Sequence, residues 1–572
     1  MKKILAYLKP YLRRMSLGLL IKFIGTLMDL LLPWILAYII DDIIPLKDIR
    51  KVVFWGGMMI LCSIVAVSGN IVANRMASRV ARDTTKEIRH DLFAKISYLS
   101  CNQVDGFGIP SLISRLTSDT YNIHNMLGMM QRLGVRAPIL LIGGIMVTLT
   151  LEPVLTLVLL AVMPFIAALV YRVSKTGIPL YTDLQRSVDK LIRTVRENIT
   201  GVRIIKALSK TDYEKKRFEA VNAEVVEAET KASRKMAVTN PAMNLFLNLG
   251  LALVILAGSY RVDSGLTQPG KIIAFLTYFT IILNAMMTIT RMFINFSKGS
   301  ASANRIRIVL DAPKDLEVQP ADFQKNGFHI AFDHVSFAYR HNQNNLEDIS
   351  FHLKKGQTLG IIGATGCGKS TLIKLLMRLY DTDSGSIRIN GMNIKSIPGD
   401  ELHTKFGIVF QNDVLFADTI AENIDFGRGL SRQEITQSSA FAQADEFIDS
   451  LPDGLLHELA IKGANLSGGQ KQRILISRAL ADHPEILILD DSSSALDYRT
   501  DARLRQALNK NFRETTTVIV AQRISSIMHA DHILVLEEGR MIGSGTHAQL
   551  LRTCDIYREI SESQLGGEDI AG

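Results

Sequence analysis

Apolar stretches long enough to cross a membrane recur six times in the first half of the chain. About 20 residues of helix span the ~30 Å of hydrocarbon in a bilayer, so each stretch predicts one membrane-crossing helix. The six predicted spans are residues 15–40, 52–74, 133–151, 153–173, 240–260 and 271–297.

The hydropathy pattern changes after the sixth span. Two prolines and Gly327 punctuate a polar stretch that predicts a linker. Beyond it, short strings rich in β-branched and aromatic residues alternate with helical strings, which predicts a soluble α/β domain. We therefore expect an α-helical membrane domain over residues 1–310, a linker over residues 311–326 and the α/β domain over residues 327–572.

The connections after the second and fourth spans are long and charged. They cover residues 74–132 and 172–240 and keep helical periodicity, as in RVARDTTKEIRHDLFAKI, so the membrane helices are expected to continue into water. Each contains a break and a short amphipathic segment, at Gly106–Leu127 and Ser209–Phe218. We expect each segment to be a coupling helix that lies across the soluble domain. A plain solvated helical hairpin is the alternative.

The charge distribution predicts how the chain sits in a membrane. The formal net charge is +9, and much of the excess borders the predicted spans, so we do not expect nucleic acid as a partner. The long connections are rich in Lys and Arg, whereas the first short loop begins with Asp41 and Asp42. Because positive residues stay on the cytoplasmic side, the N-terminus, the long connections and the α/β domain are predicted to be cytoplasmic.

Two further features exclude an exported, disulfide-bonded protein. The apolar run behind the basic first 14 residues is too long for a removable signal peptide, so we expect an uncleaved first span. Cys62, Cys101, Cys367 and Cys554 show no pairing pattern, which predicts reduced thiols.

A glycine-rich loop predicts a nucleotide site. The loop follows the strand-like string TLGIIG, precedes a helical string and fits the pattern G-x-x-x-x-G-K-S. Glycine lets backbone amides approach phosphate, the helix N-terminus adds a positive dipole end, and Lys369 supplies a cation. Ser370 offers Mg²⁺ a hydroxyl, and Asp490, at the end of the buried string ILILDD, offers a carboxylate. The predicted ATP-binding residues of this loop are Gly363, Ala364, Thr365, Gly366, Cys367, Gly368, Lys369, Ser370 and Thr371.

The string LSGGQKQR, residues 466–473, lies between these two elements and resembles the signature of ATP-binding cassette (ABC) transporters. Tyr339 resembles the aromatic residue that stacks on adenine, and Gln411 resembles the glutamine that links Mg²⁺ to the membrane domain. Residues 494–497, SALD, resemble the loop that crosses to a second cassette. With the six spans and ENITGVRIIKA, residues 197–207, the whole chain is similar to an exporter-type half-transporter.

The resemblance implies ATP hydrolysis coupled to transport, with ATP and Mg²⁺ as cofactors and a second half-transporter as partner. In that family the signature of one subunit completes the ATP site on the glycine loop of the other. The implied signature residues are Ser467, Gly468, Gly469 and Gln470. A single cassette per chain therefore requires a second chain.

Two departures from the family pattern affect hydrolysis. Asp491 stands where the family has a catalytic glutamate, and Gln522 replaces its switch histidine. Asp is one methylene shorter, a displacement of ~1 Å that can cost a hundredfold in rate. A neutral amide cannot become a cation that stabilises developing charge. With Gln411, these are the candidate catalytic residues.

The intact glycine loop and signature beside this altered pair resemble the degenerate subunit of bacterial heterodimeric multidrug exporters. Such a subunit binds ATP and hydrolyses it poorly. A slow homodimer is the alternative.

The resemblance also implies the kind of cargo and the location. Hydrophobic or amphiphilic compounds, most often drugs, are expected to leave through a bacterial cell membrane, with membrane lipid as a further partner. Asp29, in the first span, is the candidate substrate residue because an acidic group at membrane depth can attract cationic amphiphiles. Interhelical hydrogen bonding is the other interpretation of Asp29. A lipid flippase and a nucleotide-gated regulatory or channel-like subunit remain alternative functions.

Overall fold

The structure is a computed structural model that describes the chain except residues 1, 321–322, 325–326, 340–344, 493–494 and 566–572. The chain divides into two compact units. The helical unit comprises Met1–Tyr98 and Ile109–Ala312, and the α/β unit comprises Leu99–Gly108 and Pro313–Gly572.

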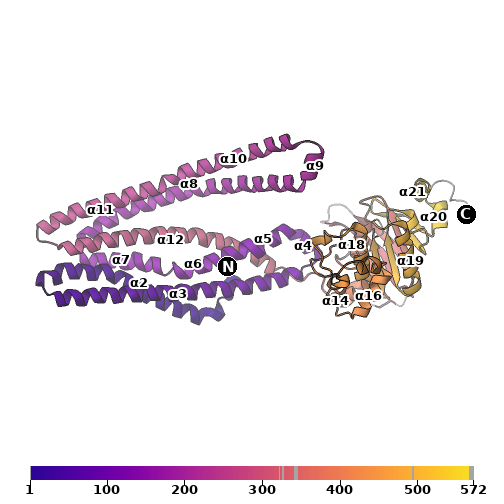
Figure 1. The fold of residues 1–572 in the computed structure, drawn as a ribbon, viewed down its shortest axis with the longest axis horizontal. Helices are drawn as coiled ribbons and strands as arrows, with labels where there is room; N and C mark the ends of the chain where they lie inside the picture. Colours follow the sequence, from indigo (N-terminus) through magenta and orange to yellow (C-terminus); the bar gives the residue numbers. More distant parts are fainter. Residues whose placement is uncertain (1, 321–322, 325–326, 340–344, 493–494, 566–572) are drawn as a thin grey trace. The chain divides into compact units, whose positions relative to one another are not determined.

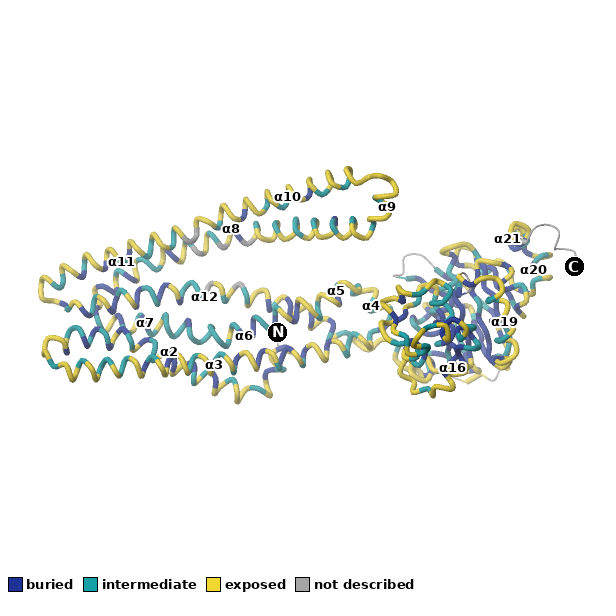
Figure 2. Tube along the Cα trace, viewed as in Figure 1, coloured by how far each residue is buried: buried dark blue, intermediate teal, exposed yellow. Residues whose placement is uncertain are grey.

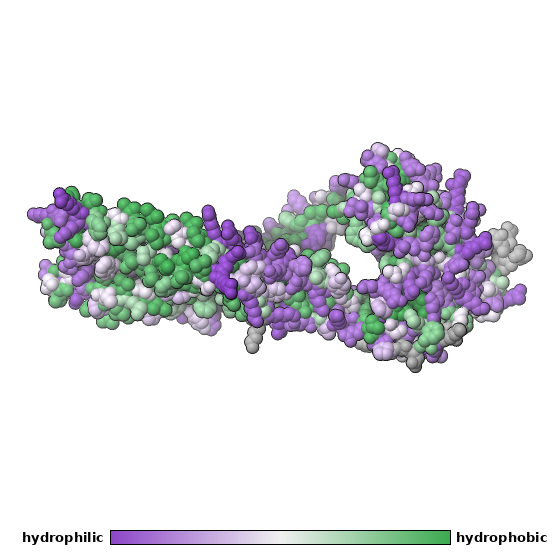
Figure 3. All heavy atoms as spheres, turned by 90° about the horizontal axis from the view of Figure 1, so that it is seen from below, coloured by the Kyte–Doolittle hydropathy of each residue, from purple (hydrophilic) through white to green (hydrophobic). Residues whose placement is uncertain are grey.

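Six helical segments of the described chain are long and apolar enough to cross a membrane (Figure 1). Every predicted span falls within one of them, so the predicted fold of this half is confirmed. The segments are Lys3–Leu46, Ile49–Ser97, Ile109–Leu151, Pro153–Thr200, Thr211–Asp263 and Pro269–Leu310. Hydrophobic side chains cover the part of this unit that carries the predicted spans, whereas its helical extensions are hydrophilic (Figure 3).

Local sequence explains where these helices begin and break. Asp48 caps the third helix by accepting a hydrogen bond from the Arg50 amide over 3.0 Å. Pro153 and Pro269 start two others, since proline suits the first turn. The helices are α1 (Lys2–Ala6), α2 (Leu12–Tyr38), a π-helical turn (Ile39–Ile43), α3 (Ile49–Ser97), α5 (Ile109–Ser114), a π-helical turn (Arg115–Asp119), α6 (Thr120–Arg132), α7 (Arg136–Leu151), α8 (Pro153–Thr200), α9 (Val202–Ala207), α10 (Thr211–Ala237), α11 (Thr239–Asp263) and α12 (Pro269–Leu310).

The helical unit consists of a bundle and a long hairpin. Figure 1 shows α2, α3, α6, α7 and α12 side by side, whereas α8 and α10 form a hairpin that diverges from them and ends in α9. Phe275, Tyr278 and Phe279 of α12 are fully buried and pack against Leu155 and Leu159 of α8. The α9 end of the hairpin is exposed along most of its length (Figure 2).

The α/β unit contains two sheets whose strand order explains where a ligand site can form. The four-stranded antiparallel sheet has the order β2 (Leu346–Leu353), β1 (Ile330–Phe337), β4 (Ser384–Ile389), β5 (Met392–Asn393). The six-stranded sheet has the order β10 (Arg540–Gly545), β9 (His532–Glu537), β3 (Thr358–Gly363), β8 (Thr516–Val520), β7 (Ile486–Asp490), β6 (Phe406–Val409). Its strands from β9 to β6 are parallel. Their carboxyl ends therefore share one edge, where open α/β sheets bind ligands.

Helices surround these sheets and complete the predicted α/β domain, which confirms the fold class. They are α13 (Lys369–Leu376), α14 (Gly399–Thr404), α15 (Ile420–Asp425), α16 (Arg432–Phe441), α17 (Asp445–Asp449), α18 (Gly468–Leu480), α19 (Tyr498–Asn511), α20 (His547–Thr553) and α21 (Asp555–Leu565).

The short helices of the long connections do not lie where the sequence predicted them. In the first connection α4 (Cys101–Phe107) belongs to the α/β unit, whereas most of the predicted segment Gly106–Leu127 belongs to the helical unit. The amphipathic pattern of that segment reflects packing within the bundle, where Ile123 and Met126 are buried. In the second connection the short helix is α9, and the predicted Ser209–Phe218 covers the following turn and the start of α10.

Candidate nucleotide site

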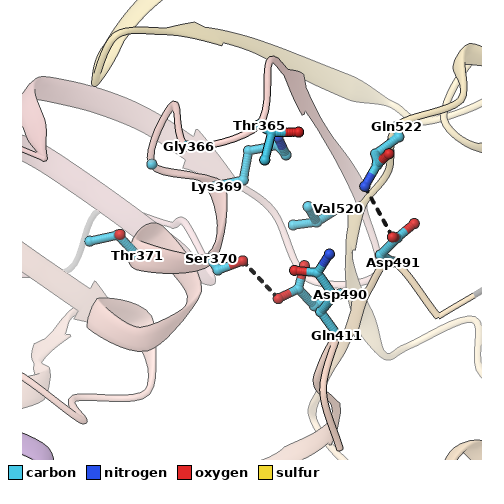
Figure 4. Close-up of a pocket in the computed structure, with 11 residues that line it drawn as sticks. Thr365, Gly366, Lys369, Ser370, Thr371, Gln411, Asp490, Asp491, Val520 and Gln522 are labelled. Carbon is cyan, nitrogen blue, oxygen red and sulfur yellow. Dashed lines mark hydrogen bonds between the residues drawn. The ribbon is translucent and has the colours of Figure 1, made fainter. Parts of the chain in front are cut away.

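One cavity of about 140 Å³ opens at the carboxyl ends of β3, β7 and β8 (Figure 4). It brings together side chains predicted as ATP-site residues from four separate segments of the sequence. The lining residues are Thr365, Gly366, Gly368, Lys369, Ser370, Thr371, Gln411, Asp490, Asp491, Val520 and Gln522.

The glycine loop occupies one wall of the cavity and has a backbone that other residues would strain. Gly368 has φ of 106°, and a Cβ there would lie 2.7 Å from the carbonyl oxygen of Asn345. The next residue, Lys369, begins α13 and donates from Nζ to the carbonyl oxygens of Gly363 (2.7 Å) and Ala364 (2.8 Å). The loop therefore presents a cation and a helix N-terminus to the same space, which suits phosphate.

Oxygen atoms suited to Mg²⁺ lie where the glycine loop and the end of β7 meet. Ser370 Oγ donates to Asp490 Oδ2 over 3.0 Å, and the Gln411 side chain lines the same cavity. Asp490 is buried, and burial raises the pKa of its carboxyl group. A hydroxyl, a carboxylate and an amide carbonyl are the hard oxygen donors that Mg²⁺ prefers, so this set fits the ion together with ATP phosphates.

Asp491 and Gln522 face each other at the far end of the cavity (Figure 4). Gln522 Nε2 donates to Asp491 Oδ2 over 3.1 Å. Asp491 has a left-handed backbone with φ of 52°, and its amide donates to the carbonyl oxygen of Val520 over 3.0 Å. Burial raises the pKa of the Asp491 carboxyl group. The Asp491 carboxylate is thus held by the neutral side-chain amide of Gln522.

The predicted signature residues lie outside this cavity, at the N-terminus of α18. Ser467 caps the helix by accepting from the Gln470 amide, while Gln470 Oε1 accepts from the Ser467 amide over 2.9 Å. Ser467 and Gly468 are exposed, and the glycines lie against Ala495. The amides of this helix start are therefore open to a ligand from outside the chain's own site. Ser494 of the predicted crossing loop lies outside the described residues.

Tyr339 and Cys367 are not among the residues that line this cavity, and their contact with ATP stays a prediction. Tyr339 does not line the cavity; its ring packs against Tyr380 at 5.2 Å between centroids, with Lys374 Nζ 5.6 Å from its centre. Cys367 lies in the glycine loop but is 4% exposed and packs into the core of the α/β unit.

Asp29, the predicted substrate residue, is engaged within the helical unit. Its Oδ2 accepts from Arg136 Nη2 at 3.0 Å and from Asn70 Nδ2 at 3.3 Å. These contacts join α2, α3 and α7 and favour the interhelical interpretation over attraction of a cation. Arg136 was not predicted from the sequence, although a charged residue in an apolar string is a recognisable signal.

Two hydrogen bonds that were not predicted from the sequence hold α4 within the α/β unit. Tyr380 donates its hydroxyl to Asp105 Oδ2 over 2.6 Å, and Ser100 donates to Asp315 over 2.6 Å. These pairs are far apart in the sequence, so no local pattern reveals them.

Comparisons with known proteins agree with this architecture. The chain matches the ABC transporter transmembrane region over residues 15–286 and the ABC transporter domain over residues 346–494. It is 37% identical over 570 residues to YfiB of Bacillus subtilis, an uncharacterized ABC transporter ATP-binding protein, covering 99% of each chain. It is 32% identical over 567 residues to YknU of the same organism, covering 98% of this chain and 97% of YknU.

The fold is similar to the structure of a bacterial Atm1-family ABC exporter with ATP bound. The TM-score is 0.83 at 26% identity, and the match covers 97% of this chain and 99% of the other. The chain belongs to the ABC transporter family as an exporter half-transporter. It is a multi-pass membrane protein that uses ATP with Mg²⁺, couples ATP hydrolysis to transport and works in a dimer of half-transporters.

Proposed function

We propose that this chain is the ATP-holding, weakly hydrolysing subunit of a heterodimeric bacterial exporter that moves hydrophobic or amphiphilic compounds, such as drugs, outward across the cell membrane. The observation that carries the proposal is the Gln522–Asp491 hydrogen bond of 3.1 Å at the hydrolytic end of an otherwise well-formed nucleotide cavity. Asp491 and Gln522, which replace the glutamate and histidine usual in the family, are thus joined to each other within the site.

We assign MgATP binding to the part of the cavity that keeps the residues usual in the family. Lys369 and the first amides of α13 bind the phosphates, and Ser370, Asp490 and Gln411 hold Mg²⁺. When bound, the metal neutralises phosphate charge and orients the terminal phosphoryl group. All of these side chains match the residues that the family pattern has at the same positions.

Hydrolysis is assigned as weak at this site because two roles are filled poorly. Asp491 has a shorter reach than glutamate, and its hydrogen bond from Gln522 occupies one of the oxygens that would accept a proton from water. Gln522 can donate a hydrogen bond to phosphate, yet it stays neutral. The chain's site therefore retains nucleotide through many cycles of the dimer.

The signature is assigned to the partner's site. Ser467 and Gly468 are exposed at the start of a 13-residue helix and do not line the chain's own cavity. A partner that supplies a glycine loop, a catalytic glutamate and a switch histidine would complete one competent site with them.

The distribution of charge and the similarity to bacterial proteins support outward transport across a bacterial cell membrane. Lys and Arg are concentrated in the long connections, which supports a cytoplasmic location for both connections and the α/β unit. The relatives named above are bacterial. The exposed α9 end of the hairpin, with Ile204 65% and Leu208 63% exposed, offers apolar surface to a second subunit.

Two differently tagged copies of this chain, expressed in the source cell, test the heterodimer. We expect neither copy to capture the other, and each to capture the same second half-transporter. The captured complex should then take up amphiphilic drugs into inverted vesicles only with ATP. Mutual capture of the two tagged copies, with no second subunit, would show a homodimer.

A further inference from the structure

Polar side chains from three segments of the helical unit meet among apolar helices. Spacings of seven and four residues put Lys22 with Asp29, and Asn70 with Asn74, on one side of their respective helices. Gly134 lies at the α6–α7 break, where a Cβ would overlap the carbonyl of Met130. The set, called the interior cluster, comprises Lys22 and Asp29 of α2, Asn70 and Asn74 of α3, and Arg132 and Arg136 on either side of the α6–α7 break.

The interior cluster lies at membrane depth. At about 1.5 Å per helical residue, Lys22 is roughly 24 Å along α2 from its end at Tyr38. Arg136 is roughly 22 Å along α7 from its end at Leu151. Both distances are shorter than the ~30 Å of hydrocarbon in a bilayer.

The cluster has hydrogen-bonding capacity left over. Lys22 is 2% exposed, and its Nζ donates to Asn74 Oδ1 at 3.0 Å. Arg136 pairs with Asp29 at 3.0 Å, and Asn70 donates to the same carboxylate oxygen. Within the described residues, Arg136 Nε and Asn70 Oδ1 are buried and have no hydrogen-bond partner.

The cluster also carries an excess of positive charge. The charged groups close enough to act on the Lys22 ammonium are Arg136, Asp29 and Arg132. Three cations against one carboxylate leave an excess of two positive charges. Uncompensated charge is costly inside a membrane, where ionisable residues pair with each other or mark a ligand path. The one carboxylate is already bound to Arg136, so the missing countercharge is an anion.

We propose that the interior cluster binds the anionic headgroup of an amphiphilic substrate, so that the exporter carries acidic amphiphiles such as alkyl phosphates. This assignment rests on the proposed export function and specifies its substrate class. The Arg136 side chain is 39% exposed and presents a planar guanidinium edge, the group best suited to phosphate or carboxylate. Lys22 is buried in the same cluster and adds a second positive charge. The charge preference is opposite to the one predicted from Asp29 alone.

The test uses the assembled complex in phosphatidylcholine nanodiscs. ATPase activity is titrated with dodecyl phosphate, dodecylphosphocholine and dodecyltrimethylammonium, which share one tail, and with inorganic phosphate, which has none. We expect stimulation by dodecyl phosphate alone. Arg136→Gln and Lys22→Met should each raise its half-maximal concentration at least tenfold. Arg186→Gln, on an exposed part of α8, is the matched control and should leave the titration unchanged.

Several outcomes would overturn the assignment. Equal stimulation by the cationic amphiphile, or unchanged sensitivity in Arg136→Gln, would make the cluster a structural ion network. A response to inorganic phosphate equal to that for dodecyl phosphate would exclude an amphiphile. If Arg136→Gln fails to assemble, photolabelling of the unaltered complex with an azido alkyl phosphate decides: label within α2, α3 or α7 supports the site, and label elsewhere overturns it. A complex that no amphiphile of either charge stimulates would refute the export function itself.

Discussion

The hydroxyl of Tyr380 ties α4 to the α/β unit, and Tyr380→Phe tests whether α4 transmits ATP-driven change. Tyr380 donates to Asp105 over 2.6 Å, and burial followed by that hydrogen bond raises its pKa, so the hydroxyl remains a neutral donor at physiological pH. A hydrogen bond to a charged group contributes about 1.5–3 kcal/mol. Asp105 is otherwise exposed, so water can replace the lost donor and the loss lies at the low end of this range. A loss of about 1.5 kcal/mol weakens the equilibrium docking of α4 on the α/β unit roughly tenfold.

The remaining contacts should keep α4 folded in the variant. Ser100 still bonds Asp315, and Gln103 Nε2 still donates to the carbonyl oxygen of Pro313 over 2.9 Å. Tyr380 does not line the nucleotide cavity, so ATP affinity should not change. We expect substrate-stimulated ATPase activity of the complex to fall about tenfold while basal activity persists.

Steady-state ATPase assays with and without substrate, alongside nucleotide-binding titrations, measure both quantities. Tyr557→Phe is the control, because it removes another buried hydroxyl of the same unit, one that contacts His547 at 2.8 Å. Asp105→Ala should resemble Tyr380→Phe, and the double variant should be no worse than either. Full stimulation in Tyr380→Phe, or additive losses in the double variant, would refute the reasoning.

Three further predictions concern the two units separately. The chain reconstituted alone should bind a fluorescent ATP analogue yet hydrolyse ATP very slowly, and turnover typical of transporters would contradict the proposed weak site. Because Cys367 is 4% exposed, its thiol can be alkylated only when the glycine loop opens, so MgATP bound to the loop should slow alkylation. Equal labelling of Cys367 with and without MgATP would contradict its placement in the ATP-binding loop. Gly270→Ala puts a Cβ 2.7 Å from the Asp41 carboxyl carbon, so the free energy of unfolding should fall by about 1–3 kcal/mol, as measured by a thermal melt. Gly57→Ala is the control, because a Cβ at Gly57 meets nothing within 4 Å. An unchanged melt for Gly270→Ala would show that α12 does not require this close approach.

Hydropathy predicted the membrane-crossing helices because the thickness of a bilayer dictates their length. The nucleotide cavity was also accessible from the sequence. Asp490 ends strand β7, and Lys369 and Gln522 follow strands β3 and β8. The carboxyl ends of parallel strands meet at one edge.

Contacts between distant parts of the chain were not predictable in the same way. Asp29 meets Arg136 across 107 positions of sequence, and neither residue carries a local signal of its partner. The segment that contains Asp119 has an amphipathic pattern, but it packs within the bundle, where Asp119 pairs with Arg305 and accepts from Ser302 over 2.8 Å. An amphipathic pattern shows that a face is buried and does not show against which unit.

The central claim is that this chain's signature supports catalysis whereas its own site does not. Steady-state ATPase activity of the purified complex, with each change made singly, tests it most directly. The proposed function assigns Ser467 and Gly468 to the partner's competent site, so Ser467→Ala or Gly468→Asp should nearly abolish activity. The proposed function assigns little turnover to the site that contains the Gln522–Asp491 pair, so Asp491→Asn should leave most activity intact. Loss of activity in Asp491→Asn as severe as in the signature variants would contradict the account.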